Sequence, residues 1–274
     1  MSRARGAIFS GGLFLAAALV LGFLVLPIVA IVARVPLHRI VDQFDDPVVR
    51  DALALTAGTN VLALVLILLV GTPAAYLLGT RRFRGRSLVI TLIELPLVLP
   101  PTVAGIGLLA AFSGRVGLLS GVLERFGIDV VFTTTAVVLA ICFVAGPFYV
   151  RQAIAAFEVL DREIVDAARV DGAGPLRVLA SIAIPLSSAG LAAGTALAFA
   201  RGMGEFGATI MFAGNLRGTT QTLSLLIYEI GAAPNGFDLA LAISALLIIV
   251  SLAILITVRL SFRASLRPVS RRGV

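Results

Sequence analysis

The sequence contains no lysine, and all 22 of its basic residues are arginine. A P-loop places a lysine on the nucleotide phosphates and a Schiff base needs a lysine amine, so this chain alone can form neither. The single histidine, His38, and the single cysteine, Cys142, exclude an HExxH zinc site, a CxxC motif and an internal disulfide. We therefore expect no metal site, no bound cofactor and no enzymatic activity in this chain.

Charge is also scarce, since 14% of the 274 residues are charged where a soluble domain carries roughly 25%. Hydrophobic residues make up 59% of the chain, and the mean hydropathy is +1.07. A water-soluble fold cannot bury that much apolar surface in one core, so lipid must surround most of the chain. The composition predicts an all-α membrane protein.

Six apolar stretches are long enough to cross a bilayer, because a transmembrane helix needs about 20 residues. They cover residues 11–34, 52–79, 88–112, 130–150, 187–212 and 238–260. The first stretch exceeds the roughly 7–15 apolar residues of a signal peptide, so we interpret it as a retained helix. Six spans place both termini on the same side of the membrane.

The arginines divide unequally between the two sides of these spans. Six lie on the side opposite the termini, and Arg201 lies inside a span. Fifteen lie on the side of the termini: Arg3, Arg5, Arg81, Arg82, Arg84, Arg86, Arg151, Arg162, Arg169, Arg177, Arg259, Arg263, Arg267, Arg271 and Arg272. The positive-inside rule then predicts that both termini are cytoplasmic. The net charge of +7 is therefore explained by the position of the arginines at the membrane, and it does not indicate nucleic-acid binding.

The cytoplasmic segment 151–186 is too long for a simple turn and is compatible with a helix. Asp161 is suited to start this helix and Glu163 to stabilise its first turn, and Gly172 and Gly174 are suited to end it. Ile164, Ala167, Ala168 and Asp171 recur at helical spacing on one face. Small residues on that face suit docking to a partner, and packing on the chain's own bundle is the alternative.

Within this segment, Asp166-Ala167-Ala168, Gly172 and then 182–185 (Ile-Ala-Ile-Pro) resemble the EAA–x3–G–x9–I–x–LP motif. That motif belongs to permease subunits of binding-protein-dependent ABC importers. Asp166 and Ile184 depart from it, but both keep the charge or apolar character of the usual residue. The stretches 195–215 and 95–101 are similar to two further blocks of the molybdate, tungstate and sulfate branch. The resemblance covers about residues 52–260.

The resemblance implies a type I ABC importer permease fold with about six transmembrane helices and a cytoplasmic coupling helix. It divides the chain into an N-terminal helix with an external loop (1–51), a transmembrane core (52–260) with an EAA-type loop at about 157–186, and a basic cytoplasmic tail (261–274). It assigns docking to a separate ATPase to the following residues: Glu163, Asp166, Ala167, Ala168, Asp171, Gly172 and Gly174.

The family's function implies that this chain forms the path of an ATP-driven oxyanion importer in the prokaryotic cytoplasmic membrane. Molybdate or tungstate is the expected cargo, and sulfate or thiosulfate is the alternative. The implied partners are an ATPase dimer that uses ATP and Mg, a second permease copy, and an external oxyanion-binding protein. A transporter without ATP and an intramembrane enzyme are the other classes. The scarcity of intramembrane ionisable residues and the lack of a catalytic set argue against them.

An arginine inside the fifth apolar stretch is costly, at roughly 2.5–3.5 kcal/mol in lipid. Glu205 lies four residues after Arg201 and is placed to pair with it. Two interpretations stay open: the pair lines the translocation path, or it only joins helices through the small-residue face. The prolines at 100 and 101 likewise indicate either a gate or a packing kink. The candidate path or gate residues are Arg201, Gly204, Glu205, Ala208, Thr209, Pro100 and Pro101.

Overall fold

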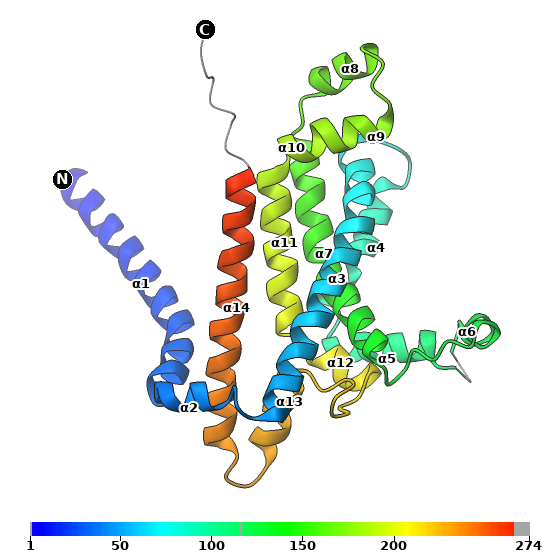
Figure 1. Cartoon of the computed structure of the whole chain (residues 1–274). Coiled ribbons are helices and arrows are strands. Elements are labelled where there is room, and N and C mark those ends of the chain that lie inside the picture. The colour runs from blue at the N-terminus through cyan, green and yellow to red at the C-terminus, as the bar shows by residue number, and fades with distance from the viewer. Residues whose placement is uncertain (1, 115–116, 266–274) are drawn as a thin grey trace.

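The computed structural model describes residues 2–114 and 117–265, and every regular element in those ranges is helical (Figure 1). The first half contains α1 (Ser2–Arg34), α2 (Leu37–Asp42), α3 (Pro47–Thr80), α4 (Arg86–Val98), α5 (Pro101–Phe112), α6 (Ser120–Phe126) and α7 (Thr134–Glu158). The second half contains α8 (Arg162–Val170), α9 (Pro175–Val178), the π-helix η1 (Leu179–Ala183), α10 (Ile184–Leu186), α11 (Ser188–Met203), α12 (Gly207–Phe212), α13 (Leu223–Ala232) and α14 (Phe237–Ser265). The predicted all-α class is confirmed.

Four helices, α1, α3, α7 and α14, are long and apolar enough to cross a membrane. The number is six if each of two bent pairs forms one span: α4 with α5, and the segment Pro175–Leu186 with α11, which is bent by 80°. Two of the six predicted apolar stretches, 88–112 and 187–212, are not continuous helices. The first is two helices, α4 and α5, whose axes are bent by 115°. The second is interrupted between Met203 and Gly207, and α11 alone, with 16 residues, is about 24 Å long.

Two consecutive prolines cause the break between α4 and α5. The residue before a proline is pushed out of the helical region, and this applies both to Leu99 and to Pro100. Their ψ angles are 134° and 135°. Pro101 then begins α5 at a position where no backbone N–H is needed. The helix is disturbed at these prolines, as predicted, and the chain changes direction there by 115°.

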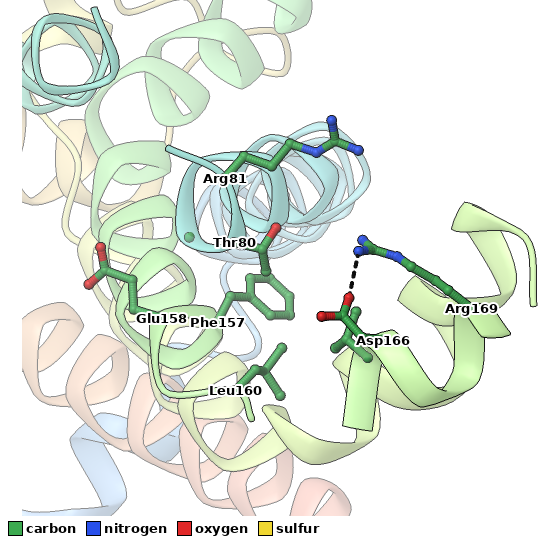
Figure 2. A pocket seen from close by; sticks show the side chains of 9 residues that line it. Thr80, Arg81, Phe157, Glu158, Leu160, Asp166 and Arg169 are labelled. Atoms are coloured by element: carbon green, nitrogen blue, oxygen red, sulfur yellow. Dashed lines mark hydrogen bonds and ion pairs between the residues drawn. The ribbon is translucent and has the colours of Figure 1, made fainter. Parts of the chain in front are cut away.

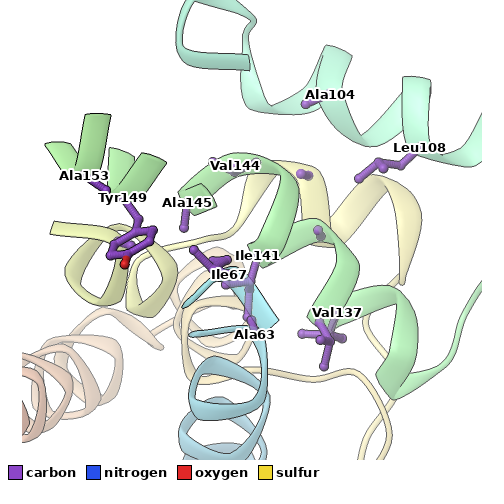
Figure 3. Packing of buried hydrophobic residues seen from close by; sticks show 14 of the residues in the cluster. Ala63, Ile67, Ala104, Leu108, Val137, Ile141, Val144, Ala145, Tyr149 and Ala153 are labelled. Carbon is purple, nitrogen blue, oxygen red and sulfur yellow. The ribbon is translucent and has the colours of Figure 1, made fainter. Parts of the chain in front are cut away.

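The core is built around α7, which packs most extensively against α3 and α11. Figure 3 shows α7 side chains such as Ile141 and Tyr149 packed with Ala63 and Ile67 of α3. Small residues bring these helices close: a Cβ at Gly194 of α11 would lie 3.0 Å from Gln152 Cβ. Such close approach suits helices that associate in lipid without a hydrophobic driving force.

The long helices define two ends of the bundle. The α8 end carries α8, the N-terminal end of α1 and the C-terminal end of α14, and the opposite end carries α2, α6 and α13 (Figure 1). Both ends of the described chain therefore lie on the side of α8, as six crossings require. Residues 266–274 of the expected basic tail lie outside the described residues.

Candidate functional site

The predicted boundaries of the helix in segment 151–186 are found in α8. The Asp161 carboxylate accepts a hydrogen bond from the Glu163 backbone N–H at 2.9 Å, which caps the helix start. Gly172 follows the helix with a φ of +83°, a left-handed conformation that glycine adopts without strain. An ion pair of 3.1 Å joins Asp166 to Arg169 on the helix surface.

One side of α8 packs on the chain and the other is open. Val165 is buried, with 7% of its surface exposed, and Ala168 is half-buried. Ile164 is 45% exposed, Val170 is 88% exposed and Ala167 is exposed as well. The sequence-predicted docking residues all lie on α8 or in the turn that follows it. Val170 is an exposed apolar side chain at the end of this helix.

A cavity of about 220 Å³ separates α8 from the ends of α3 and α7 (Figure 2). Thr80, Phe157 and Leu160 line it from the bundle, and Asp166 and Arg169 line it from α8. The cavity is open to the surface and lies beside the contact that buries Val165 of α8.

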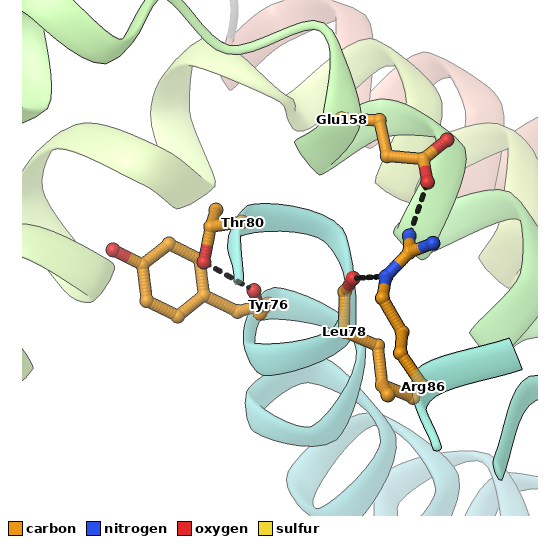
Figure 4. Close-up of polar contacts among 5 residues, drawn as sticks. All are labelled: Tyr76, Leu78, Thr80, Arg86 and Glu158. Carbon is orange, nitrogen blue, oxygen red and sulfur yellow. Dashed lines mark hydrogen bonds and ion pairs between the residues drawn. The ribbon is translucent and has the colours of Figure 1, made fainter. Parts of the chain in front are cut away.

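The helix ends beside this cavity are tied together by Arg86 (Figure 4). This residue lies in the first turn of α4, and its Nη2 pairs with the carboxylate of Glu158 in the last turn of α7. Its Nε donates to the Leu78 carbonyl near the end of α3 at 2.6 Å. One side chain thus joins three helices next to α8.

The candidate path residues cluster at the break between α11 and α12. Arg201 Nη2 lies 2.8 Å from Glu205 Oε2, and this contact is an ion pair without good hydrogen-bond alignment. The other Glu205 oxygen accepts from the Ala208 backbone N–H at 2.7 Å, so Glu205 joins the end of α11 to the start of α12. The Glu205 side chain is 1% exposed and that of Arg201 is 27% exposed.

Helix α12 packs closely on α5, which brings the two chain breaks together. A Cβ at Gly207 would lie 2.6 Å from Pro101 Cβ, and a Cβ at Gly105 would lie 2.7 Å from the Ala208 carbonyl oxygen. Ala208 and Thr209 are fully buried, and Gly204 is exposed. In this conformation Ala208 and Thr209 therefore face the inside of the subunit. Among the residues that the structure describes, no group of three His, Cys, Asp or Glu is placed to hold a metal.

Comparison with known proteins gives a family for this architecture. The profile of the family described as "Binding-protein-dependent transport system inner membrane component" matches residues 71–266. The chain belongs to this family. It is therefore a multi-pass membrane protein and a permease component of a binding-protein-dependent transport system, as its sequence motifs predict.

Three similar proteins agree with this membership. The chain is 41% identical over 236 residues to the molybdenum transport system permease protein ModB of Mycobacterium bovis, covering 86% of this chain and 88% of that protein. It is 36% identical over 241 residues to the probable transport system permease protein NifC of Clostridium pasteurianum, covering 88% and 83%. A chain in the crystal structure of a bacterial alginate ABC transporter has a TM-score of 0.76 at 18% identity, with 96% of each chain covered. The predicted ABC importer permease fold is confirmed.

Proposed function

We propose that this chain is the permease subunit of an ATP-driven importer of molybdate or tungstate. The identity of 41% to a molybdenum transport permease is the observation that carries the choice of cargo. The arginine at the break of α11 supports an anionic cargo, because a guanidinium is always charged and binds tetrahedral oxyanions in a forked geometry. The chain itself binds no cofactor, since ATP and Mg belong to the partner ATPase.

The α8 segment is the contact with that ATPase. Its open face presents Ile164, Ala167 and Val170 without a partner in the described chain, and its acidic residues Glu163, Asp166 and Asp171 are exposed as well. Ala168, Gly172 and Gly174 allow close approach of another backbone. ATP-driven closure of the ATPase dimer moves α8 against the bundle, and the cavity beneath α8 gives it room.

The translocation path forms between this subunit and a second, identical copy. Both termini are cytoplasmic, so the α8 end faces the ATPase and the α13 end faces an external oxyanion-binding protein. Arg201 and Glu205 lie at the path, and Gly204, Ala208, Thr209, Pro100 and Pro101 form the gate. The close packing of Ala208 on Gly105 of α5 is the closed position of this gate. Broken helices are found in membranes where they border such a path.

Purification of the tagged chain with its ATPase and binding protein tests this proposal. ATP hydrolysis by the purified complex is measured with the binding protein empty or loaded with molybdate, tungstate or sulfate. Molybdate and tungstate are expected to stimulate hydrolysis and sulfate is not. Stimulation by sulfate alone would assign the chain to a sulfate or thiosulfate importer. Failure of any ATPase to copurify would contradict the proposal as a whole.

A further inference from the structure

Helices α4 and α7 are joined by two ion pairs at different levels. Arg86 of α4 pairs with Glu158 of α7, and Glu94 of α4 lies 3.4 Å from Arg151 of α7. The second pair reverses the first, because its arginine comes from α7. The spacing along the two antiparallel helices is nearly the same, eight residues on α4 and seven on α7, so both pairs bridge the same two helices.

The second pair lies further from the α8 end of the bundle than the first. At 1.5 Å per residue, Glu94 is about 12 Å along α4 from Arg86, and Arg151 is about 10 Å along α7 from Glu158. Arg86, with the exposed arginines at 81, 82 and 84 in the preceding loop, marks the membrane surface at the α8 end. Long arginine side chains at such a depth normally extend toward the headgroups. Arg151 instead contacts a carboxylate at its own depth.

Arg151 is nevertheless open on the surface of the subunit. Its side chain is 66% exposed and that of Glu94 is 33% exposed. From Ala136 to Val150, α7 has no exposed residue, and then Arg151, Ala155 and Glu158 are exposed along one stripe toward the α8 end. An arginine at this depth is strongly disfavoured in lipid tails, so this stripe borders water.

Around the Glu94–Arg151 pair, the outer face of α4 is apolar and the charged residues lie at its edge. Leu88, Leu92 and Val98 of α4 are 63%, 58% and 77% exposed and form an apolar outer face suited to lipid or to another helix. Glu94 lies at the edge of that face, next to the α7 stripe. The Glu94 charge therefore lies on the side of α4 that packs on α7, and the outer face of α4 is apolar at this level.

Arg151 lies on the α8 side of Arg201 along the bundle axis. Gly194 of α11 contacts Tyr149 and Gln152 of α7, which places it at the level of Arg151. Arg201 lies seven residues further along α11, about 10 Å toward the α13 end. In both pairs the carboxylate is the more buried partner and the guanidinium faces the surface: Arg201 with Glu205 at 27% and 1%, and Arg151 with Glu94 at 66% and 33%.

We propose that Arg151 is a second anion-binding position on the translocation path, on the cytoplasmic side of Arg201, and that Glu94 is its positioning residue. This inference rests on the proposed function. The ligand is a tetrahedral, doubly charged oxyanion that leaves Arg201 as the gate opens. Arg201 and Arg151 are about one cargo diameter or more apart, so they divide the path into short steps. The carboxylates of Glu205 and Glu94 weaken the binding of the anion to these arginines, so that it is released.

Thiol labelling tests whether the stripe is a water-filled, anion-attracting surface. In a Cys142→Ala background, Ala155→Cys places a thiol one turn from Arg151, and Leu69→Cys places a control thiol on α3 at a site 66% exposed. Inside-out vesicles holding the full complex are treated with anionic and cationic membrane-impermeant methanethiosulfonates. Ala155→Cys is expected to react about ten-fold faster than Leu69→Cys with the anionic reagent, and molybdate is expected to slow that reaction.

Adding Arg151→Gln is expected to abolish the molybdate protection and to lower the ratio of anionic to cationic labelling by about ten-fold. Equal labelling of Ala155→Cys and Leu69→Cys would overturn the inference, because the stripe would then face lipid or a permease contact. Labelling that molybdate does not slow would also overturn it. These readouts do not depend on transport, so they separate this inference from the proposed function.

Import assays provide the second measurement. Arg151→Gln is expected to lower molybdate import about ten-fold with normal ATPase copurification, whereas Arg151→Lys retains the charge and most of the import. Normal import by Arg151→Gln alongside an active parent complex would contradict this inference alone. A parent complex that imports no oxyanion would contradict the proposed function, and molybdate protection of Ala155→Cys would still report on Arg151.

Discussion

Arg86 and Glu158 connect the first turn of α4 to the last turn of α7, three residues before the cap of α8 at Asp161. Because Arg86 also bonds the Leu78 carbonyl, the ends of α3, α4 and α7 are tied at one point. If α8 is the ATPase contact, as proposed, a force applied to it is expected to reach these three membrane helices together.

Removing the two contacts of Arg86 separately tests this connection. Glu158→Gln removes only the ion pair, which is partly exposed and contributes about 0.2–1 kcal/mol. Arg86→Ala also leaves the Leu78 carbonyl without its donor, a further loss of about 0.5–1.5 kcal/mol. We expect import to fall in both variants, more strongly in Arg86→Ala, with unchanged ATPase copurification. Equal import in Arg86→Ala and the parent chain would contradict the connection.

A bulky residue on the open face of α8 is expected to block docking. Ala167→Trp adds a large side chain at an exposed position, so the fold tolerates it but a partner's groove does not. Ser87→Trp is the matched control, because Ser87 is exposed at the same end of the bundle but lies on α4. Copurification of the ATPase should be lost in Ala167→Trp and retained in Ser87→Trp. Retention in both variants would place the ATPase contact elsewhere.

The contact between α5 and α12 gives a matched pair on one helix. Gly105→Ala places a methyl group 2.7 Å from the Ala208 carbonyl, and such overpacking costs about 1–3 kcal/mol. Gly107→Ala meets no atom within 4 Å and should stabilise the helix by about 0.5–1 kcal/mol. Thermal unfolding in detergent should therefore shift in opposite directions. A similar shift in both variants would show that the two chain breaks are not packed together.

The roles of Arg201 and Glu205 are separable by a double change. Glu205→Leu leaves Arg201 without its partner and the Ala208 N–H without its acceptor, and we expect a loss near the low end of the roughly 3–5 kcal/mol for broken buried pairs. The Arg201→Leu, Glu205→Leu variant should regain much of this stability, since apolar replacement of a buried pair is often tolerated. Its import should remain poor, because the path has lost its charge. Normal import in the stable double variant would show that Arg201 and Glu205 have only a structural role.

Local signals in the sequence predicted local structure well. The Asp161 cap, the Gly172 end of α8 and the chain break at Pro100 and Pro101 each depend on backbone preferences of a few adjacent residues. The break after Met203 was missed because it depends on tertiary contacts. The Glu205 carboxylate caps α12 only once α11 has ended, and Gly207 packs on Pro101 from a distant helix.

The ion pairs between residues far apart in the sequence could not be predicted from it either. In the sequence, Arg86 and Arg151 count only as cytoplasmic arginines, and nothing in it identifies the partner of Glu94 or Glu158. Only the antiparallel packing of α4 and α7 brings them into two pairs. The four residues do carry a weak signal, since two opposite charges at matching spacing occur on both helices. Many other pairs of charges in the chain have comparable spacing, so the signal alone does not select this one.

Accumulation of labelled molybdate in proteoliposomes tests the central claim most directly. The chain is reconstituted with its ATPase, with ATP inside the vesicles and the binding protein outside. We predict that molybdate accumulates above its external concentration only when ATP and the binding protein are both present. Equal accumulation without ATP, or no accumulation when both are present, would contradict the assignment of this chain as the permease of an ATP-driven oxyanion importer.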